Sequence, residues 1–175
     1  TTLFRSKILF DTNQLLQRAK SEEEILSQTA SQLMKLLNRS LIVYPEQKGD
    51  LGSEQFFGVD GETAQNIFSA PEERDAANWT FANKKRSGAG TDSYPDAKGL
   101  YLALRTGGGV FGVIGIDLSE KPLDAFENSV LLSILGEGAL AIENRRNALE
   151  KEQATVQAKN EELRANLLRT ISHDL

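Results

Sequence analysis

The run Val110-Phe111-Gly112-Val113-Ile114-Gly115-Ile116-Asp117-Leu118 decides the fold of this 175-residue chain. It is rich in β-branched residues, which favour strands. Its apolar side chains point to both faces, so it predicts a central strand that is covered on both sides. The glycines of Thr106-Gly107-Gly108-Gly109 join it to an earlier strand, residues 100–105, as a hairpin.

Shorter elements are predicted upstream of this hairpin. Ser21 and Glu24 have the spacing of a capping box and so start a helix, whereas Pro45 is expected to end the first strand. The order of the elements predicts an α+β domain with a central, mostly antiparallel sheet flanked by helices. The predicted helices cover residues 3–20, 21–37, 62–68 and 71–86, and the predicted early strands cover residues 41–44 and 55–59.

The composition excludes several classes of function. The chain has no cysteine and one histidine, which rules out disulfides, thiolate nucleophiles and a multi-histidine zinc site. A net charge of −5 argues against binding to nucleic acid or to an anionic membrane. No run approaches the length of an apolar membrane span. We therefore expect no metal and no resident cofactor.

The last stretch predicts one long helix. Residues 124–175 contain no proline, and the part from Ala139 onward would be about 55 Å long as a helix. Apolar residues recur every seven positions, which is half of a coiled-coil seam, whereas the companion positions are polar. Such a seam suits an adjustable dimer, and it also suits a marginal, partly frayed helix. The heptad residues are Leu135, Ile142, Leu149, Val156 and Leu163.

The chain ends in Ser172-His173-Asp174-Leu175, which resembles the start of the phosphoacceptor motif of sensor histidine kinases. The chain stops before the Arg and Pro that complete that motif. A neutral histidine ring nitrogen can accept phosphate, and the adjacent carboxylate of Asp174 can act as an auxiliary base. The alternative is that His173 is an ordinary surface histidine. The long helix before it favours the phosphoacceptor.

The predicted body is similar to a GAF domain, because the run from Val110 to Leu118 resembles the last strand of that family. Trp79 and Phe81, then Ala89-Gly90-Thr91-Asp92, then the strand from Leu100 resemble the potassium-responsive sensor kinases. This resemblance implies an N-terminal signalling helix over residues 1–20, a sensory domain over 21–142 and a linker helix over 143–175. It also implies the cytoplasmic part of a bacterial protein that is anchored in the inner membrane, with a role in potassium or osmotic signalling.

For the parent protein, the resemblance implies an ATP- and Mg-dependent kinase whose partner is a response regulator. The fragment lacks the catalytic ATP-binding domain and should be inactive alone. It should form a parallel homodimer through its N- and C-terminal helices. A start at Thr1 and a stop inside a motif also suggest a piece of a longer protein.

A ligand site is expected in the body near Trp79, Gly90, Thr91, Asp92 and Tyr101. Two closely spaced glycines allow a concave run of backbone N–H groups, although a plain turn-rich connection explains them as well. GAF relatives bind cyclic nucleotides, haem or bilins. The absence of cysteine argues against a covalent bilin, and the single distant histidine argues against a histidine-ligated haem. A ligand-free dimerisation spacer is the third alternative.

Overall fold

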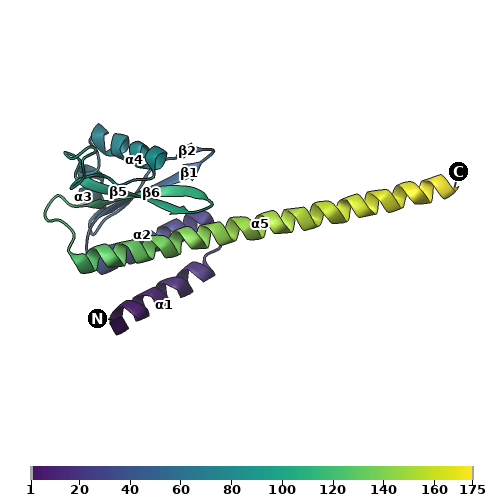
Figure 1. Cartoon of the computed structure of the whole chain (residues 1–175), viewed down its shortest axis with the longest axis horizontal. Helices are drawn as coiled ribbons and strands as arrows, with labels where there is room; N and C mark the ends of the chain where they lie inside the picture. The colour runs from purple at the N-terminus through teal and green to yellow at the C-terminus, as the bar shows by residue number, and fades with distance from the viewer. Residues whose placement is uncertain (1, 175) are drawn as a thin grey trace. The chain divides into compact units, whose positions relative to one another are not determined.

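The computed structural model describes residues 2–174 (Figure 1). The chain divides into two compact units, the first ending at Ile142 and the second beginning at Glu143. The first unit is built on a six-stranded sheet in which every pair of neighbouring strands is antiparallel. The strand order is β2-β1-β6-β5-β4, and β3 also pairs with β1. The strands are β1 (Leu41–Gln47), β2 (Asp50–Leu51), β3 (Gln55–Phe57), β4 (Ser87–Gly88), β5 (Gly99–Thr106) and β6 (Gly109–Asp117).

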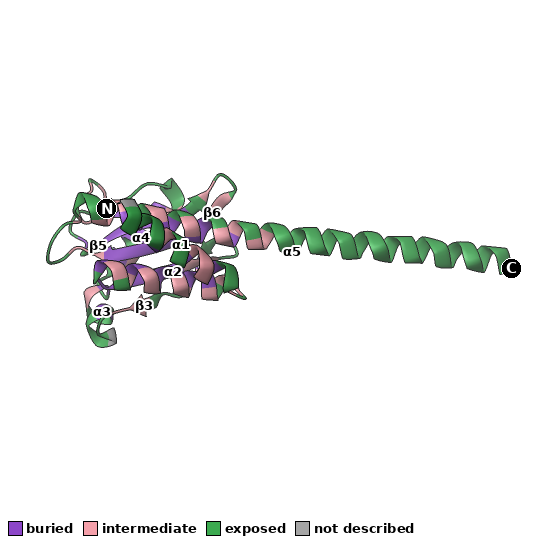
Figure 2. Ribbon diagram, turned by 90° about the horizontal axis from the view of Figure 1, so that it is seen from below, coloured by how far each residue is buried: buried purple, intermediate pink, exposed green. Residues whose placement is uncertain are grey.

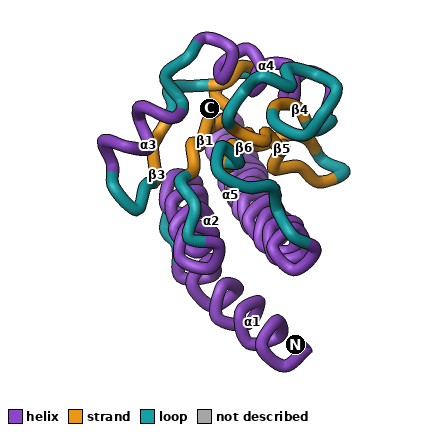
Figure 3. The backbone as a smooth tube through the Cα atoms, turned by 90° about the vertical axis from the view of Figure 1, so that its left-hand side faces the viewer, coloured by secondary structure: helices purple, strands orange, loops and turns teal. Residues whose placement is uncertain are grey.

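Helices cover both faces of this sheet (Figures 1 and 3). One face carries α2 (Glu22–Leu37) and the first part of α5 (Ala125–Asp174), and α1 (Thr2–Arg18) packs on these two helices on the side away from the sheet (Figures 1 and 3). The other face carries α3 (Gly61–Ile67) and α4 (Pro71–Asn83). The predicted α+β class, with helices around a mostly antiparallel sheet, is therefore confirmed.

The predicted central strand is β6, which lies between β1 and β5. Its residues 111–116 are all buried, because their side chains enter two separate hydrophobic clusters, one on each face of the sheet (Figure 2). Phe111, Ile114 and Ile116 join the cluster under α1, α2 and α5. Val113 joins the cluster under α3 and α4. The prediction of a central strand covered on both sides, made from the apolar residues of this run, is therefore confirmed.

Local signals set several helix ends. The Glu24 backbone N–H donates to Ser21 Oγ at 3.1 Å, and the Lys20 N–H donates to Glu24 Oε2 at 2.8 Å, so the expected capping interaction is present. At the start of α5, the Glu127 N–H donates to Asp124 Oδ1 at 2.7 Å. These side chains satisfy N–H groups that have no partner within the helix.

The expectation that Pro45 ends the first strand is wrong, because β1 continues to Gln47. Pro45 lies opposite Gly112 on β6, where a Cβ atom would come within 2.8 Å of the Tyr44 carbonyl oxygen. The missing side chain at Gly112 therefore lets the two backbones approach at a residue that lacks an N–H donor. The short strands β2 and β4 were not predicted.

Helix α5 extends from Ala125 to Asp174 without interruption. Among residues 2–174 it is the one helix that meets a length-and-composition test for a membrane span, a test that core helices of soluble proteins also meet. Its residues Val130, Leu131, Ile134 and Leu135 belong to the core cluster under α1 and α2. Residues 147–174, described by themselves, are all exposed.

Candidate functional site

The loop after β4 supplies three of the predicted ligand residues. Gly90 has a φ of +77°, a conformation that suits glycine. Thr91 Oγ1 lies 2.8 Å from the Gly88 carbonyl oxygen and 2.9 Å from that of Ser93, so its hydroxyl closes the loop on itself. Asp92 is exposed. The polar groups of this loop are therefore largely occupied within the loop.

The side chain of Tyr101 is fully buried under α4. Its hydroxyl donates to Glu73 Oε1 at 2.8 Å, and burial together with the Glu73 carboxylate raises the pKa of Tyr101. Glu73 also accepts the backbone N–H groups of Lys98 and Gly99, each at 2.9 Å. This carboxylate therefore joins α4 to the end of the loop and to β5.

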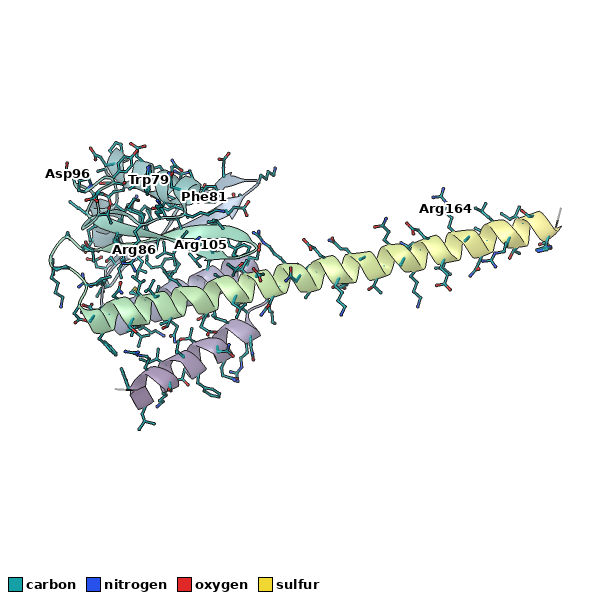
Figure 4. The ribbon with its side chains drawn as sticks, in the orientation of Figure 1. Trp79, Phe81, Arg86, Asp96, Arg105 and Arg164 are labelled. Atoms are coloured by element: carbon teal, nitrogen blue, oxygen red, sulfur yellow. The ribbon has the colours of Figure 1, made fainter. Side chains whose placement is uncertain are left out.

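Trp79 lies half-buried on α4, next along the helix to the buried Thr80 (Figure 4). Thr80 Oγ1 lies 2.7 Å from Ser87 Oγ, and Ser87 Oγ donates to the Ala76 carbonyl at 2.7 Å, so this side of α4 is bonded to β4. The structure thus places Tyr101 in the core and Asp92 on the surface, and it brings Gly90 and Thr91 together only as loop neighbours.

A cavity of about 480 Å³ opens at a different place, beside β1 and the connection between α3 and α4. Arg74 lies 4.9 Å from the centre of the Tyr44 ring and donates to the carbonyl oxygens of Leu51 and Gly52. Glu54 lies 3.5 Å from the same guanidinium, and both side chains are partly exposed. The cavity is lined by Tyr44, Glu54, Phe56, Gln65, Phe68, Ser69, Ala70, Pro71 and Arg74.

The sequence analysis missed this cavity. Its walls come from β1, β3 and α4, together with the residues between α3 and α4, and no motif links these segments. The nearest signal was the group of aromatic residues in the predicted strands over residues 41–44 and 55–59, which are Tyr44, Phe56 and Phe57. Among the residues that the structure describes, no group of three or more His, Cys, Asp or Glu side chains could hold a metal ion.

The predicted phosphoacceptor lies in the last turn of α5. His173 and Asp174 are exposed, and Leu175, the last residue of the motif, lies outside the described residues. Within residues 143–174 the heptad side chains Leu149, Val156 and Leu163 are 44%, 54% and 60% exposed. A continuous helix thus carries an apolar stripe that is exposed among the described residues, and its last turn holds an accessible histidine.

Two curated relatives match nearly the whole chain. The sensor protein KdpD of Clostridium acetobutylicum is 33% identical over 172 residues, which is 98% of this chain and 19% of the relative. The sensor protein KdpD of Escherichia coli K12 is 25% identical over 174 residues, again 98% of this chain and 18% of the relative. No protein-family model matches the chain.

Solved structures agree on the fold. The native GAF domain of the potassium sensor histidine kinase KdpD from Escherichia coli gives a TM-score of 0.57 at 18% identity, over 86% of this chain and 99% of that structure. The chain has the fold of a GAF domain and is similar in sequence to the KdpD sensor proteins. The GAF domain of an Acinetobacter phosphoenolpyruvate-protein phosphotransferase gives the same TM-score at 11% identity, over 82% of this chain and 95% of that structure.

These matches confirm the expected GAF-like fold and the expected similarity to KdpD sensor proteins. The chain spans less than a fifth of the length of the curated KdpD relatives it matches. The activity and partners of the whole protein are therefore inferences from this module. In the first unit, the cavity beside Arg74 offers space for a ligand, and the ligand site expected near Trp79, Gly90, Thr91, Asp92 and Tyr101 stays a prediction.

Proposed function

We propose that this GAF domain is the cytoplasmic sensory and dimerisation module of a sensor histidine kinase anchored in a bacterial inner membrane. In this proposal residues 1–20 are a signalling helix, residues 21–142 the sensory domain and residues 143–175 the linker to the phosphoacceptor. The observation that carries it is the exposed His173 in the last turn of a helix that starts in the GAF core. Potassium or osmotic signalling is the proposed role of the pathway.

The chemistry assigns separate roles to the last described residues. The unprotonated ring nitrogen of His173 attacks the γ-phosphorus of Mg-bound ATP in the kinase domain of the parent protein, the bond to the β,γ-bridging oxygen breaks and ADP leaves, and Asp174 takes up the proton from the other ring nitrogen. A response regulator is the next acceptor. This chain alone should not label with phosphate, because it lacks the domain that holds ATP.

The test uses the full-length protein with radiolabelled ATP and Mg. Labelling should be lost in His173→Gln and slowed in Asp174→Asn, whereas Asp92→Asn, in the loop of the GAF domain, should label normally. Because His173 is the only histidine of the chain, a labelled peptide from this region identifies it without ambiguity. Full labelling of His173→Gln would refute the assignment.

The dimer is the second part of the proposal. Two helices of the first unit expose apolar side chains: Leu3 and Phe10 on α1 are 86% and 63% exposed, and Leu132 and Leu140 on α5 are 48% and 47% exposed. Asn13 Nδ2 donates to Glu137 Oε2 at 3.1 Å, so the two helices lie against each other. A second copy of the chain, in parallel orientation, would cover this face.

A small-molecule-binding role is the alternative that the cavity beside Arg74 favours. The cavity's walls are aromatic and it contains one guanidinium group, and ligand pockets are typically lined by aromatic side chains with a few polar or charged groups. A metabolite panel should then contain a compound that raises the melting temperature, because a ligand that binds only the native state stabilises it. Ser69→Trp, at the cavity wall, should abolish that shift, and Gln17→Trp on the exposed side of α1 should not. A domain that no panel compound stabilises favours the ligand-free spacer.

A further inference from the structure

One arginine closes the junction at which β6 leads into α5. Arg39 follows the end of α2, and its side chain is only 7% exposed. Its guanidinium donates to the carbonyl oxygens of Asp117, Lys121 and Pro122 at 3.0, 2.7 and 3.0 Å. It also donates to both carboxylate oxygens of Glu127, at 3.1 and 3.3 Å.

These contacts use the whole donor capacity of the side chain. An arginine has five N–H groups in a planar fork, and Arg39 makes five hydrogen bonds through Nε, Nη1 and Nη2. Glu127 belongs to the first turn of α5 and also accepts the Asp124 N–H at 3.3 Å. One buried ion pair thus fixes the start of α5 to the end of α2.

The same two helices meet a second time, at a point of close contact. A Cβ atom on Gly138 would lie 2.7 Å from Thr29 Oγ1, so α2 and α5 approach there as closely as a glycine allows. The Thr29 hydroxyl is held in place by its bond to the Ile25 carbonyl at 2.7 Å. Glu127, in the first turn of α5, lies beside Arg39, just after the end of α2. Gly138, further along α5, lies beside Thr29, which is earlier in α2. The two helices are therefore antiparallel, and two contacts fix their alignment.

We propose that Arg39 is a positioning residue: its junction with Glu127 sets the axial register of α5 on α2. A shift or rotation of α5 must then break the two hydrogen bonds between Arg39 and Glu127 and separate a charge pair, so α5 has one preferred register and a defined point of release. The consequence for signalling rests on the proposed function, because α5 is the helix that ends at His173. The register itself does not depend on a dimer or on a kinase.

The test is a disulfide reporter between α2 and α5 in the full chain. A Cβ atom built on Gly138 lies 3.4 Å from the Thr29 Cβ, close to the range of about 3.5–4.5 Å that disulfides use. The chain has no cysteine, so Thr29→Cys with Gly138→Cys gives a single intramolecular pair. The measured quantity is the rate of disulfide formation in monomeric protein under mild oxidation.

Arg39→Met should slow this rate by about tenfold or more, because a buried carboxylate without its partner drives the start of α5 out of place. Arg39→Lys should restore only part of the rate, since an ammonium group has three donors and no fork. Arg86→Met is the matched control. Arg86 also bonds to the start of α5, at Asn128, but it is exposed and makes one such bond at 3.1 Å, so its loss should leave the rate unchanged.

Two further variants separate register from stability. Tyr101→Phe weakens the opposite face of the sheet and should not slow the disulfide, whereas Glu127→Gln should slow it even if Arg39→Met does not fold. Equal rates in Arg39→Met, Glu127→Gln and Arg86→Met would overturn the proposal, as would equal slowing in Tyr101→Phe. Phosphate labelling at His173 is measured separately, so a failure of the kinase assignment can be distinguished from a failure of the register proposal.

Discussion

At the scale of single residues, Glu73 has an unusual environment for a carboxylate. It is 1% exposed, and it accepts hydrogen bonds from two backbone N–H groups and the Tyr101 hydroxyl rather than from a basic side chain. Its place in the first turn of α4 adds the favourable end of the helix dipole. These interactions let a buried charge join three segments of the domain.

Glu73→Gln should therefore destabilise the domain by about 2 kcal/mol, because an amide presents an N–H group where a backbone N–H needs an acceptor. Glu72→Gln is the control, since Glu72 is its exposed neighbour and should change stability little. Urea unfolding followed by circular dichroism measures both. Equal unfolding midpoints in the two variants would show that the carboxylate of Glu73 is not needed.

Glu127 gives a prediction about pH. Its hydrogen bonds with Arg39 hold the pKa of this carboxyl below its usual range. A lowered folded pKa adds stability above the unfolded value of about 4.3, and this stability is lost as the pH falls through the folded value. Between neutral pH and pH 3, the unfolding free energy should fall less steeply in Glu127→Gln than in the natural chain. Parallel curves would contradict the assigned cause.

At the scale of elements, α5 carries two glycines in unlike surroundings. A Cβ atom on Gly138 would meet Thr29, whereas one on Gly136 would meet no atom within 4 Å. Gly138→Ala should thus destabilise the first unit by about 1–3 kcal/mol through overpacking. Gly136→Ala should stabilise it by about 0.5–1 kcal/mol, because alanine loses less backbone freedom in a helix. Thermal unfolding that gives the same sign for both would refute this account of the α2–α5 contact.

Elements whose signals are local could be predicted from the sequence. The capping residues Ser21 and Asp124 act within one turn of chain, and β6 shows its double burial in its own composition. Pro45 and Glu73 could not be read this way, because a glycine on another strand and N–H groups some 25 residues away decide their roles. The cavity beside Arg74 was missed for the same reason, since distant segments form its walls.

At the scale of the whole molecule, residues 147–174 of α5 present an apolar stripe that a second copy of the chain could cover. Residues 147–174 are exposed throughout, yet Leu149, Val156 and Leu163 repeat at the heptad spacing. In the proposed parallel dimer these side chains form one row of the seam, and the companion row contains polar residues such as Gln153 and Asn160. A seam with one apolar row is weak, and a weak seam can change its packing when the GAF domain changes state.

The seam can be strengthened by design, and that gives the last prediction. Arg146→Leu with Gln153→Leu places two apolar residues in the companion row, so the dimer dissociation constant should fall by about tenfold or more, and signalling in the full-length protein should lock in one state. Lys151→Leu with Ala158→Leu adds two leucines at the same spacing on the opposite side of the helix and should leave the dimer unchanged. Sedimentation equilibrium measures both pairs. Equal dissociation constants for the natural chain and the seam variant would show that this stripe is not the dimer seam, and it would leave the apolar face of α1 and α5 to hold the two copies together.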